Sequence, residues 1–329
     1  MMSIAGLVMF AATAAATTTP QAPSKTPDSY AVAGERIAIA PGRALNLRCT
    51  GEGPRTVLLE AGANADSTTW FRVQPLLASR ARVCAYDRAG HGFSDEGPLP
   101  RDLDASVADL AALVEAADLR TPLVLVGHSL GSNIVRRYAQ QYPRQVGALV
   151  LVDPPEQGAD ALLPPAWKAQ GEAARGRRDA LLDACLAAAG DGSLDQAQGP
   201  LASCLRTPPP WQSPRVAAAS RANKLRPGYR RTLHSELDAN VAIFASPVPD
   251  DESHGDTPLV VLAAPAAQGG VPEEVAAALQ EARERTRAQL VASSRQGRRV
   301  DVPGTTHEIQ LDAPQAVAQA VSEVLARGP

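Results

Sequence analysis

The chain of 329 residues is 45% hydrophobic, which is enough for one large buried core. Its formal net charge is −3 and it has no run of basic residues, which argues against a nucleic-acid-binding protein. The four cysteines, Cys49, Cys84, Cys185 and Cys204, do not have the spacing of a zinc site. An oxidising compartment would pair them fully, but their spacing leaves the pairing open.

Residues 1–29 are predicted to be a signal-like segment followed by a flexible tether. Apolar residues run from Ile4 to Ala16, and a segment rich in Thr, Pro and Ser follows, although no Lys or Arg precedes the apolar run. This run is shorter than the roughly 20 residues that a membrane-spanning helix needs. We therefore expect a secreted or periplasmic protein without stable membrane insertion of the mature chain. A disordered tail of low complexity is the alternative.

Apolar, β-branched segments bounded by turn residues predict a series of strands. They are residues 36–40, 44–49, 56–62, 82–87, 122–127, 148–153, 258–264 and 298–302. Helical periodicity follows around residues 107–114, 130–138 and 317–325, and Asp312 with Gln315 has the pattern of a capping box for the last helix. Two strands followed by alternating strands and helices predict an α/β protein, with a mostly parallel, eight-stranded sheet covered by helices on both faces.

Residues 154–256 interrupt this alternation. They contain prolines, glycines and amphipathic helical segments but no convincing strand, and they are too numerous for a loop. We therefore expect a helical lid at 154–256, inserted after the sixth strand, and a core made of residues 30–153 and 257–329. Trp167 and Trp211 in this predicted lid are candidates either for lining a substrate pocket or for the lid's own core.

The segment LVLVGHSLGSNI, residues 123–134, places Ser129 between two glycines where a predicted strand meets a predicted helix. A serine hydroxyl becomes a strong nucleophile only when a base takes its proton, and a tight strand-to-helix turn projects the side chain away from the backbone. His307 lies on a Gly/Thr loop after the last predicted strand, where the base of such an arrangement is expected. The sequence thus favours Ser129 as nucleophile and His307 as base over a plain turn serine.

These motifs resemble those of the α/β-hydrolase superfamily. The resemblance extends from Glu35 to Leu325 through LLEAGANADSTTW, YDRAGHGFSD, GHSLG and the histidine loop. The chain is similar to a subgroup of this superfamily in which the loop after the third strand reads E-A-G in place of the more usual H-G. The resemblance implies the α/β-hydrolase fold. It also implies a structural role for the residues of the second motif, which are Asp87, Arg88, Gly90 and Ser94.

The same resemblance implies an oxyanion hole built from backbone N–H groups. Leu130, which follows the nucleophile, is one implied donor. The other is on the E-A-G loop, where Gly62, Ala63 and Asn64 are all candidates and the sequence does not choose between them.

The acid of the triad departs from the commonest family pattern. No carboxylate follows the seventh predicted strand before Glu273 and Glu274. In another subset of the family the acid ends the sixth strand, which is where Asp153 stands. The resemblance therefore implies Asp153 as the residue that orients His307, with a cap of the turn into the lid as its alternative role. Glu274, Glu273 and Glu60 are the reserve acids.

The resemblance also bears on the cysteines. In this family the second strand lies beside the fourth, so Cys49 and Cys84 are implied to pair across the sheet. Cys185 and Cys204 are near one another in the predicted lid, and we expect them to form the second disulfide.

The main hypothesis is a secreted serine hydrolase, a carboxylesterase that forms an acyl-enzyme on Ser129 with a small-molecule ester. Its mechanism requires no cofactor and no metal. Amidase or aminopeptidase, lactonase and C–C hydrolase activities are alternatives on the same fold, and lid carboxylates such as Glu236 and Asp238 are available to hold a substrate amine. A non-catalytic ligand-binding homologue is the alternative from another class. The sequence leaves the oligomeric state open.

Overall fold

A sheet of eight strands forms the centre of the computed structural model, which describes residues 22–266 and 270–327. In spatial order the strands are β1 (Glu35–Ala40), β2 (Arg43–Thr50), β4 (Arg82–Tyr86), β3 (Thr56–Glu60), β5 (Leu123–His128), β6 (Val146–Val152), β7 (Leu259–Ala263) and β8 (Gly297–Asp301). β2 pairs antiparallel with both β1 and β4, and all pairs from β4 to β8 are parallel. The predicted fold class is thus confirmed. The signal-like run Ile4 to Ala16 lies outside the described residues.

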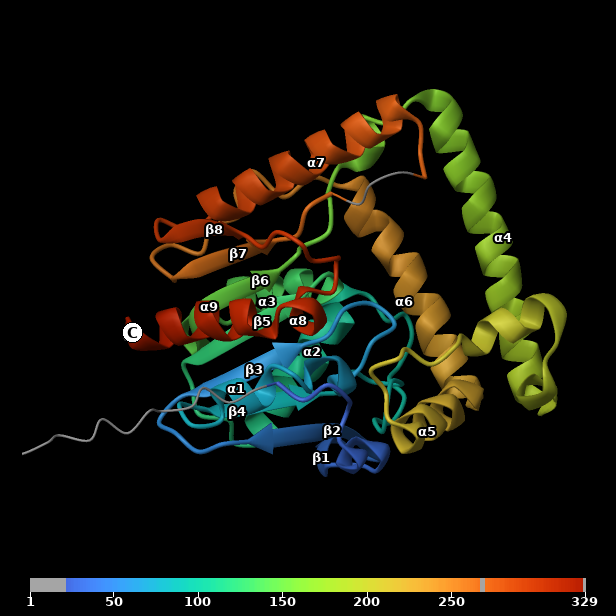
Figure 1. The fold of residues 1–329 in the computed structure, drawn as a ribbon, viewed down its shortest axis with the longest axis horizontal. Coiled ribbons are helices and arrows are strands. Elements are labelled where there is room, and N and C mark those ends of the chain that lie inside the picture. The colour runs from blue at the N-terminus through green and yellow to red at the C-terminus, as the bar shows by residue number, and fades with distance from the viewer. Residues whose placement is uncertain (1–21, 267–269, 328–329) are drawn as a thin grey trace, which may run out of the picture.

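The helices cover both faces of the sheet and one of its ends (Figure 1). They are α1 (Gln74–Leu77), α2 (Leu103–Ala116), α3 (Leu130–Gln141), α4 (Pro165–Gly190), α5 (Pro214–Leu225), α6 (Pro227–Ala245), α7 (Glu273–Ala292), α8 (Ile309–Asp312) and α9 (Pro314–Ala326). Alternate residues of β5 show how the sheet is buried: Leu125 packs in a cluster with Ile134 of α3, whereas Val124 packs in a cluster with Val317 of α9. This period of two, apolar on both faces, is typical of a central parallel strand.

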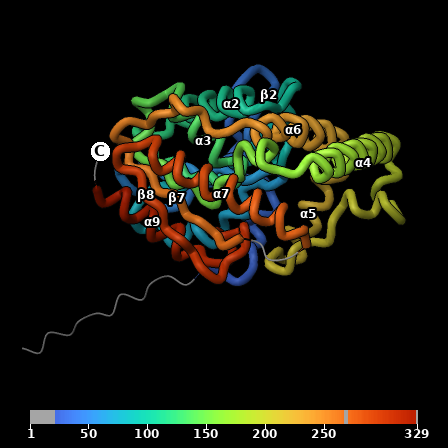
Figure 2. Tube along the Cα trace, turned by 90° about the horizontal axis from the view of Figure 1, so that it is seen from above, coloured from blue at the N-terminus to red at the C-terminus, as the bar shows by residue number. Residues whose placement is uncertain are grey.

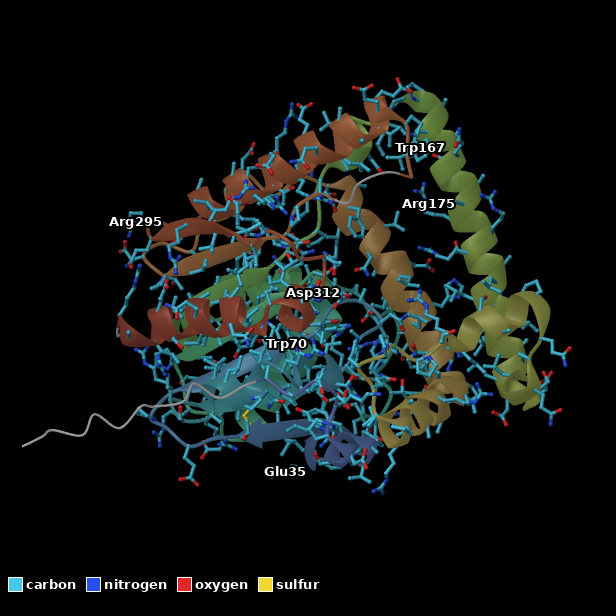
Figure 3. The ribbon with its side chains drawn as sticks, in the orientation of Figure 1. Glu35, Trp70, Trp167, Arg175, Arg295 and Asp312 are labelled. Atoms are coloured by element: carbon cyan, nitrogen blue, oxygen red, sulfur yellow. A yellow bond between two sulfur atoms is a disulfide. The ribbon has the colours of Figure 1, made fainter. Side chains whose placement is uncertain are left out.

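The start of α9 differs from the capping box expected at Asp312. The helix begins at Pro314 after Ala313, which makes no side-chain cap, and Asp312 instead ends the short helix α8. Its carboxylate accepts hydrogen bonds from Thr306 N at 2.7 Å and Thr306 Oγ1 at 2.6 Å. Figure 3 shows Asp312 beside α8. The capping prediction was wrong because the Asp312 carboxylate binds Thr306, in the loop that carries His307, and does not bind the N–H groups of α9.

Residues 154–256, the predicted lid, form α4, α5 and α6 with short 3-10 turns between β6 and β7. Figures 1 and 2 show these three helices together at one end of the molecule. None of the helices in residues 22–266 and 270–327 is long and apolar enough to cross a membrane.

Part of the predicted tether packs against this end of the molecule. Thr26 is buried, and its backbone N–H donates to Trp211 O at 2.9 Å. The Trp211 ring in turn stacks on Phe71 with ring centroids 5.6 Å apart. Trp211 therefore holds the segment before β1 against the body of the protein.

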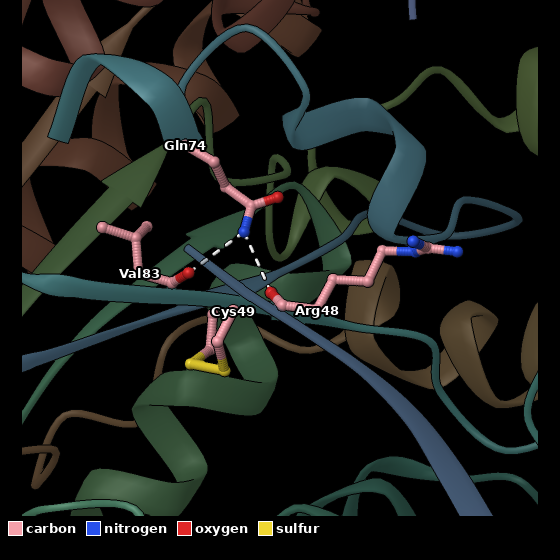
Figure 4. Close-up of a disulfide and its surroundings, with 5 residues drawn as sticks. Arg48, Cys49, Gln74 and Val83 are labelled. Carbon is pink, nitrogen blue, oxygen red and sulfur yellow. Dashed lines mark hydrogen bonds between the residues drawn. A yellow bond between two sulfur atoms is a disulfide. The ribbon is translucent and has the colours of Figure 1, made fainter. Parts of the chain in front are cut away.

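Both disulfides join the cysteines as expected, Cys49 with Cys84 and Cys185 with Cys204. Cys49 and Cys84 stand directly opposite one another in the antiparallel pair of β2 and β4. Figure 4 shows how Gln74 Nε2 bridges the same strands, donating to Arg48 O at 2.9 Å and to Val83 O at 3.1 Å. The second disulfide links the end of α4 to the 3-10 turn Gly199–Leu205.

Candidate active site

Ser129 stands at the turn between β5 and α3, with φ 49° and ψ −121°. A non-glycine residue with positive φ is strained, and such strain persists only where the surroundings enforce it. Here the turn is packed without room for side chains on its flanks: a Cβ on Gly127 would lie 2.3 Å from Gly131 O, and one on Gly131 would lie 2.5 Å from Glu60 O. The two glycines of the motif therefore let α3 begin directly against the sheet.

The structure places Ser129 and Asp153 at the same edge of the sheet. In the parallel pair β5 and β6, His128 is in register with Val152, so both residues follow their strands at the same level. Ser129 N donates to Val152 O at 3.0 Å, and Asp153 N donates to Leu262 O at 2.8 Å. These bonds hold both residues at the carboxyl ends of the strands, where open α/β sheets bind ligands.

His307 meets Asp153 across this edge. The loop between β8 and α8 brings His307 Nδ1 to 2.7 Å from Asp153 Oδ2. Because a carboxylate only accepts, Nδ1 carries the proton and Nε2 is left as the basic nitrogen of the neutral ring. No described residue is hydrogen-bonded to His307 Nε2.

The other carboxylate oxygen of Asp153 is held independently of His307. Ala264 N donates to Oδ1 at 3.1 Å, and Arg287 Nη2 of α7 donates to the same oxygen at 2.9 Å. Oδ2 is thereby directed at the imidazole. Arg287 is a residue that the sequence analysis missed, and no local pattern marks it, because it lies 134 positions from Asp153.

His128 also contributes to the site, by fixing the loop of His307. Its Nε2 donates to His307 O at 2.9 Å, and the two rings lie 4.7 Å apart between centroids. Burial, together with the neighbouring His307, lowers the pKa of His128 to about 3, so this ring is neutral. A neutral ring beside His307 avoids the repulsion that a second positive charge would cause.

The pKa values of Asp153 and His307 move in opposite directions. Burial would raise the pKa of Asp153, but the hydrogen bond and charge of His307 and the donors on Oδ1 outweigh it and hold the pKa below its ordinary value. Burial would likewise lower the pKa of His307, but Asp153 outweighs burial and raises it. Each group thus stabilises the charged form of the other.

The reserve acids lie elsewhere. Glu273 and Glu274 are exposed in the first turn of α7. Glu60 is buried, with Arg88 Nη1 2.8 Å from its Oε1 and the Tyr86 hydroxyl hydrogen-bonded to its Oε2. No contact between these three carboxylates and His307 is found among the described residues, whereas Asp153 contacts it directly.

A pocket of about 240 Å³ opens beside Ser129. Its wall from the core contains Ala63, Ser129, Leu130 and Asn133, and its wall from the predicted lid contains Pro155, Arg178, Leu237, Asn240, Val241, Ile243 and Phe244. The lining is mostly apolar with a few amide and charged groups, which is usual for a small-molecule site. Neither Trp167 nor Trp211 lines it, and Figure 3 shows Trp167 at the far end of α4, near α7.

The candidate oxyanion donors differ in their contacts. Leu130 is the first residue of α3, where backbone N–H groups have no partner within the helix. Asn64 N already donates to Glu236 Oε1 at 2.9 Å. Ala63 lines the pocket together with Ser129 and Leu130. Among the candidates on the E-A-G loop, Ala63 is therefore better placed than Asn64.

The lid carboxylates considered for an amine substrate are both engaged. Glu236 is buried and accepts hydrogen bonds from Asn64 N and from Arg88 Nε, the latter at 3.0 Å. Asp238 accepts from Arg178 Nη2 at 3.0 Å. Glu236 is thus buried among its donors, whereas Asp238 is 55% exposed and pairs with Arg178, which lines the pocket.

Comparison with known proteins supports the same fold. Residues 55–189 match the family model described as alpha/beta hydrolase fold. A segment of 105 residues is 37% identical to an uncharacterized protein of Mycobacterium tuberculosis and covers 32% of this chain and 30% of that protein. A segment of 102 residues is 38% identical to lipase LipV of Mycobacterium tuberculosis and covers 31% of this chain and 38% of that protein. The chain thus spans about a third of the length of these curated relatives.

Among solved structures, a thermophilic esterase from Thermogutta terrifontis is similar with a TM-score of 0.58 and 21% identity, over 89% of this chain and 99% of that one. Sequence identity at this level is evidence for a shared fold only, so the reaction has to be inferred from the residues of the site. The chain therefore has the α/β-hydrolase fold, and residues 55–189 match the model of that name.

Proposed function

We propose that this protein is an exported serine hydrolase that cleaves small carboxylic esters through an acyl-enzyme on Ser129. The observation that carries the proposal is the hydrogen bond between His307 Nδ1 and Asp153 Oδ2, which leaves Nε2 as the basic nitrogen at the edge where Ser129 stands. The resemblance to lipase LipV and to the esterase fold supports ester chemistry. The two disulfides support export, because such bonds persist in oxidising compartments.

In the proposed reaction, Ser129 Oγ attacks the acyl carbon while His307 Nε2 takes the hydroxyl proton. Asp153 stabilises the imidazolium that forms, and the backbone N–H groups of Leu130 and Ala63 donate to the developing oxyanion. Collapse of the tetrahedral intermediate breaks the C–O bond, and His307 gives its proton to the departing alcohol. Water then attacks the acyl-enzyme with His307 again as base, which releases the acid and restores Ser129.

The pocket next to Ser129 sets the proposed substrate class. Its volume of about 240 Å³ and its mostly apolar lining suit a short or medium acyl chain. The apolar side chains of α6 would surround that chain, which gives the predicted lid the role of choosing acyl length. A panel of chromogenic esters of graded chain length, run beside an anilide and a lactone, would separate the ester reading from the amidase and lactonase alternatives.

A fluorophosphonate probe provides the direct test of the proposal. The probe phosphonylates serines that a neighbouring base activates, with loss of fluoride, so we expect one adduct, located by mass spectrometry on the peptide that contains Ser129. Ser129→Ala should abolish this labelling. A protein that stays unlabelled at Ser129 while folded would contradict the enzyme proposal and favour the non-catalytic binding protein.

The pH dependence of kcat/KM is expected to report His307. The base must be neutral, so the rate should rise with increasing pH through the pKa of His307 and then level off. Asp153 raises that pKa, so the midpoint should lie above the ordinary histidine value. Initial rates measured from acidic to mildly alkaline pH, corrected for spontaneous hydrolysis, would show it. A midpoint below the ordinary value would mean that Asp153 does not outweigh burial at His307.

A further inference from the structure

A buried ion cluster connects α6 of the predicted lid to the E-A-G loop. At its centre is Arg88, whose side chain is 4% exposed between Glu60 and Glu236, themselves 1% and 5% exposed. Arg88 Nη1 donates to Glu60 Oε1 at 2.8 Å, and Arg88 Nε donates to Glu236 Oε2 at 3.0 Å. The cluster therefore brings together β3, the loop after β4 and a helix more than a hundred positions later.

The same guanidinium also binds the backbone of the loop. Arg88 Nη1 donates to Ala61 O and Arg88 Nη2 donates to Gly62 O, each at 2.7 Å. The peptide bond between Gly62 and Ala63 is trans, so its N–H points away from its C=O. Because Gly62 O points to Arg88, Ala63 N–H points to the opposite side of the peptide.

Glu236 acts on the next residue of the loop. Its Oε1 accepts from Asn64 N at 2.9 Å, and Tyr229, also on α6, is hydrogen-bonded through its hydroxyl to Asn64 Oδ1. These contacts occupy Asn64 N–H and hold the residue that follows Ala63. The loop is thus bound on both sides of the Gly62–Ala63 peptide, by Arg88 before it and by the lid helix after it.

The loop is also packed onto the nucleophile turn. A Cβ on Gly62 would lie 2.8 Å from His128 Nδ1 and 3.3 Å from Ser129 Cβ, so the backbone of Gly62 rests against both residues. Ala63 lines the pocket together with Ser129 and Leu130. A displacement of the loop would therefore change the position of Ala63 N–H relative to the nucleophile.

We propose that Arg88 and Glu236 are positioning residues of the oxyanion hole, which together hold the Gly62–Ala63 peptide so that Ala63 N–H faces the substrate carbonyl oxygen. This inference rests on the proposed function. We call Arg88 and Glu236 together the clamp on the Gly62–Ala63 peptide. Because α6 supplies Glu236, the predicted lid then orients the oxyanion hole as well as enclosing the acyl chain. Arg88, which the sequence motif marks as structural, then acts on catalysis through the loop it binds.

The two carboxylates contribute differently to the clamp. Burial would raise the pKa of Glu236, but the charges of Arg88 and His91, together with the hydrogen bonds from His91 and Asn64 N, outweigh burial and hold that pKa well below its ordinary value. For Glu60, burial outweighs Arg88 and raises the pKa. Glu236 is thus held in its charged form more strongly than Glu60 and is the main counterion of Arg88. Its replacement should therefore disturb the clamp.

Arg88→Lys tests the clamp with the positive charge retained. A single ammonium group does not reproduce the planar fork that binds Ala61 O, Gly62 O and two carboxylates together. We expect kcat for a short ester to fall by about 10²-fold with KM changed by less than about threefold, because a misplaced donor affects the transition state selectively. Arg101→Lys is the matched control: Arg101 is also buried and binds Asp109 and Pro98 O, but it does not touch the loop.

Glu236→Gln tests the lid side of the clamp. Glu252→Gln is a closely matched control, because Glu252 is also buried, binds Arg136 through two hydrogen bonds and lies 3.1 Å from His254. Glu236 likewise lies 3.3 Å from His91 Nε2, so both variants remove one buried charge beside an arginine and a histidine, and similar losses of melting temperature are expected. Only Glu236→Gln should lower kcat, by about tenfold or more.

A trifluoromethyl ketone separates positioning from plain destabilisation. It forms a tetrahedral adduct with the serine and places an oxyanion in the hole, so its inhibition constant should rise by the same factor as kcat falls in Arg88→Lys and Glu236→Gln. The inference is overturned if the loss of kcat matches that of the controls at equal melting temperature, or if the ketone binds these variants as tightly as the wild type.

Measurements on the wild-type protein distinguish failure of the clamp inference from failure of the proposed function. Absence of ester hydrolysis and of fluorophosphonate labelling at Ser129 in the folded wild type would remove the proposed function and, with it, the clamp. An active wild type whose Arg88 and Glu236 variants behave as their controls would remove the clamp alone.

Discussion

Ser129→Ala is expected to lower kcat for ester hydrolysis by about 10⁴- to 10⁶-fold. The variant keeps the pocket, His307 and the oxyanion donors but has no atom that can form the acyl-enzyme. Residual hydrolysis should therefore come only from water attacking a bound ester. Single-turnover and steady-state rates with a chromogenic ester, compared with the spontaneous rate, would measure the loss.

Ser132→Ala is the control for this experiment. Ser132 is buried one turn later on the same helix, and its hydroxyl donates to Gly127 O at 2.8 Å. Its removal should cost about 1 kcal/mol of unfolding free energy while ester hydrolysis is retained. If Ser129→Ala hydrolysed esters at a rate close to that of Ser132→Ala, Ser129 would not be the nucleophile.

Asp153→Asn is expected to lower kcat/KM by about 10³- to 10⁴-fold near neutral pH, because it imposes the wrong tautomer on His307. Ala264 N and Arg287 Nη2 both donate to Oδ1, so an asparagine would keep its carbonyl oxygen there and turn its NH₂ toward His307 Nδ1. That nitrogen would have to accept, which places the proton on Nε2. In this tautomer Nε2 has no lone pair to receive the proton of Ser129.

The pH profile of Asp153→Asn provides a second measurement. Loss of the carboxylate removes the interaction that raises the pKa of His307, so the midpoint of the remaining activity should move to lower pH. Glu273→Gln and Glu274→Gln serve as controls, since both side chains are exposed in the first turn of α7. A loss in either control as large as that in Asp153→Asn would transfer the acid role to α7.

Much of the fold could be predicted from local sequence alone. The strands of the sheet are short apolar runs bounded by turn residues, and in β5 every residue is buried because both faces are covered. The turn at Ser129 could also be anticipated, since Gly127 and Gly131 are required by contacts within the same strand-to-helix unit. In these cases the type of residue that a position needs is set by neighbours close in sequence or by the general pattern of the fold.

The capping prediction at Asp312 shows where such local reasoning fails. The pattern of Asp312 and Gln315 is compatible with a helix cap, but the carboxylate binds Thr306 in the loop before it. Choosing between two nearby sets of donors depends on how the chain turns around His307. That turn is set by the packing of the loop and not by the residues of the motif.

The amino-acid sequence by itself determined the α/β class, the strand-to-helix turn at Ser129 and the candidates for base, acid and oxyanion donors. Only the tertiary structure decided which candidates meet. Asp153 reaches His307 across 154 positions, Arg287 holds Asp153 across 134, and Glu236 binds the loop at Asn64 across 172. The physical reason is that hydrogen bonds and ion pairs act over a few ångströms of space, and only the packing of sheet, loops and lid helices brings such distant residues within that range.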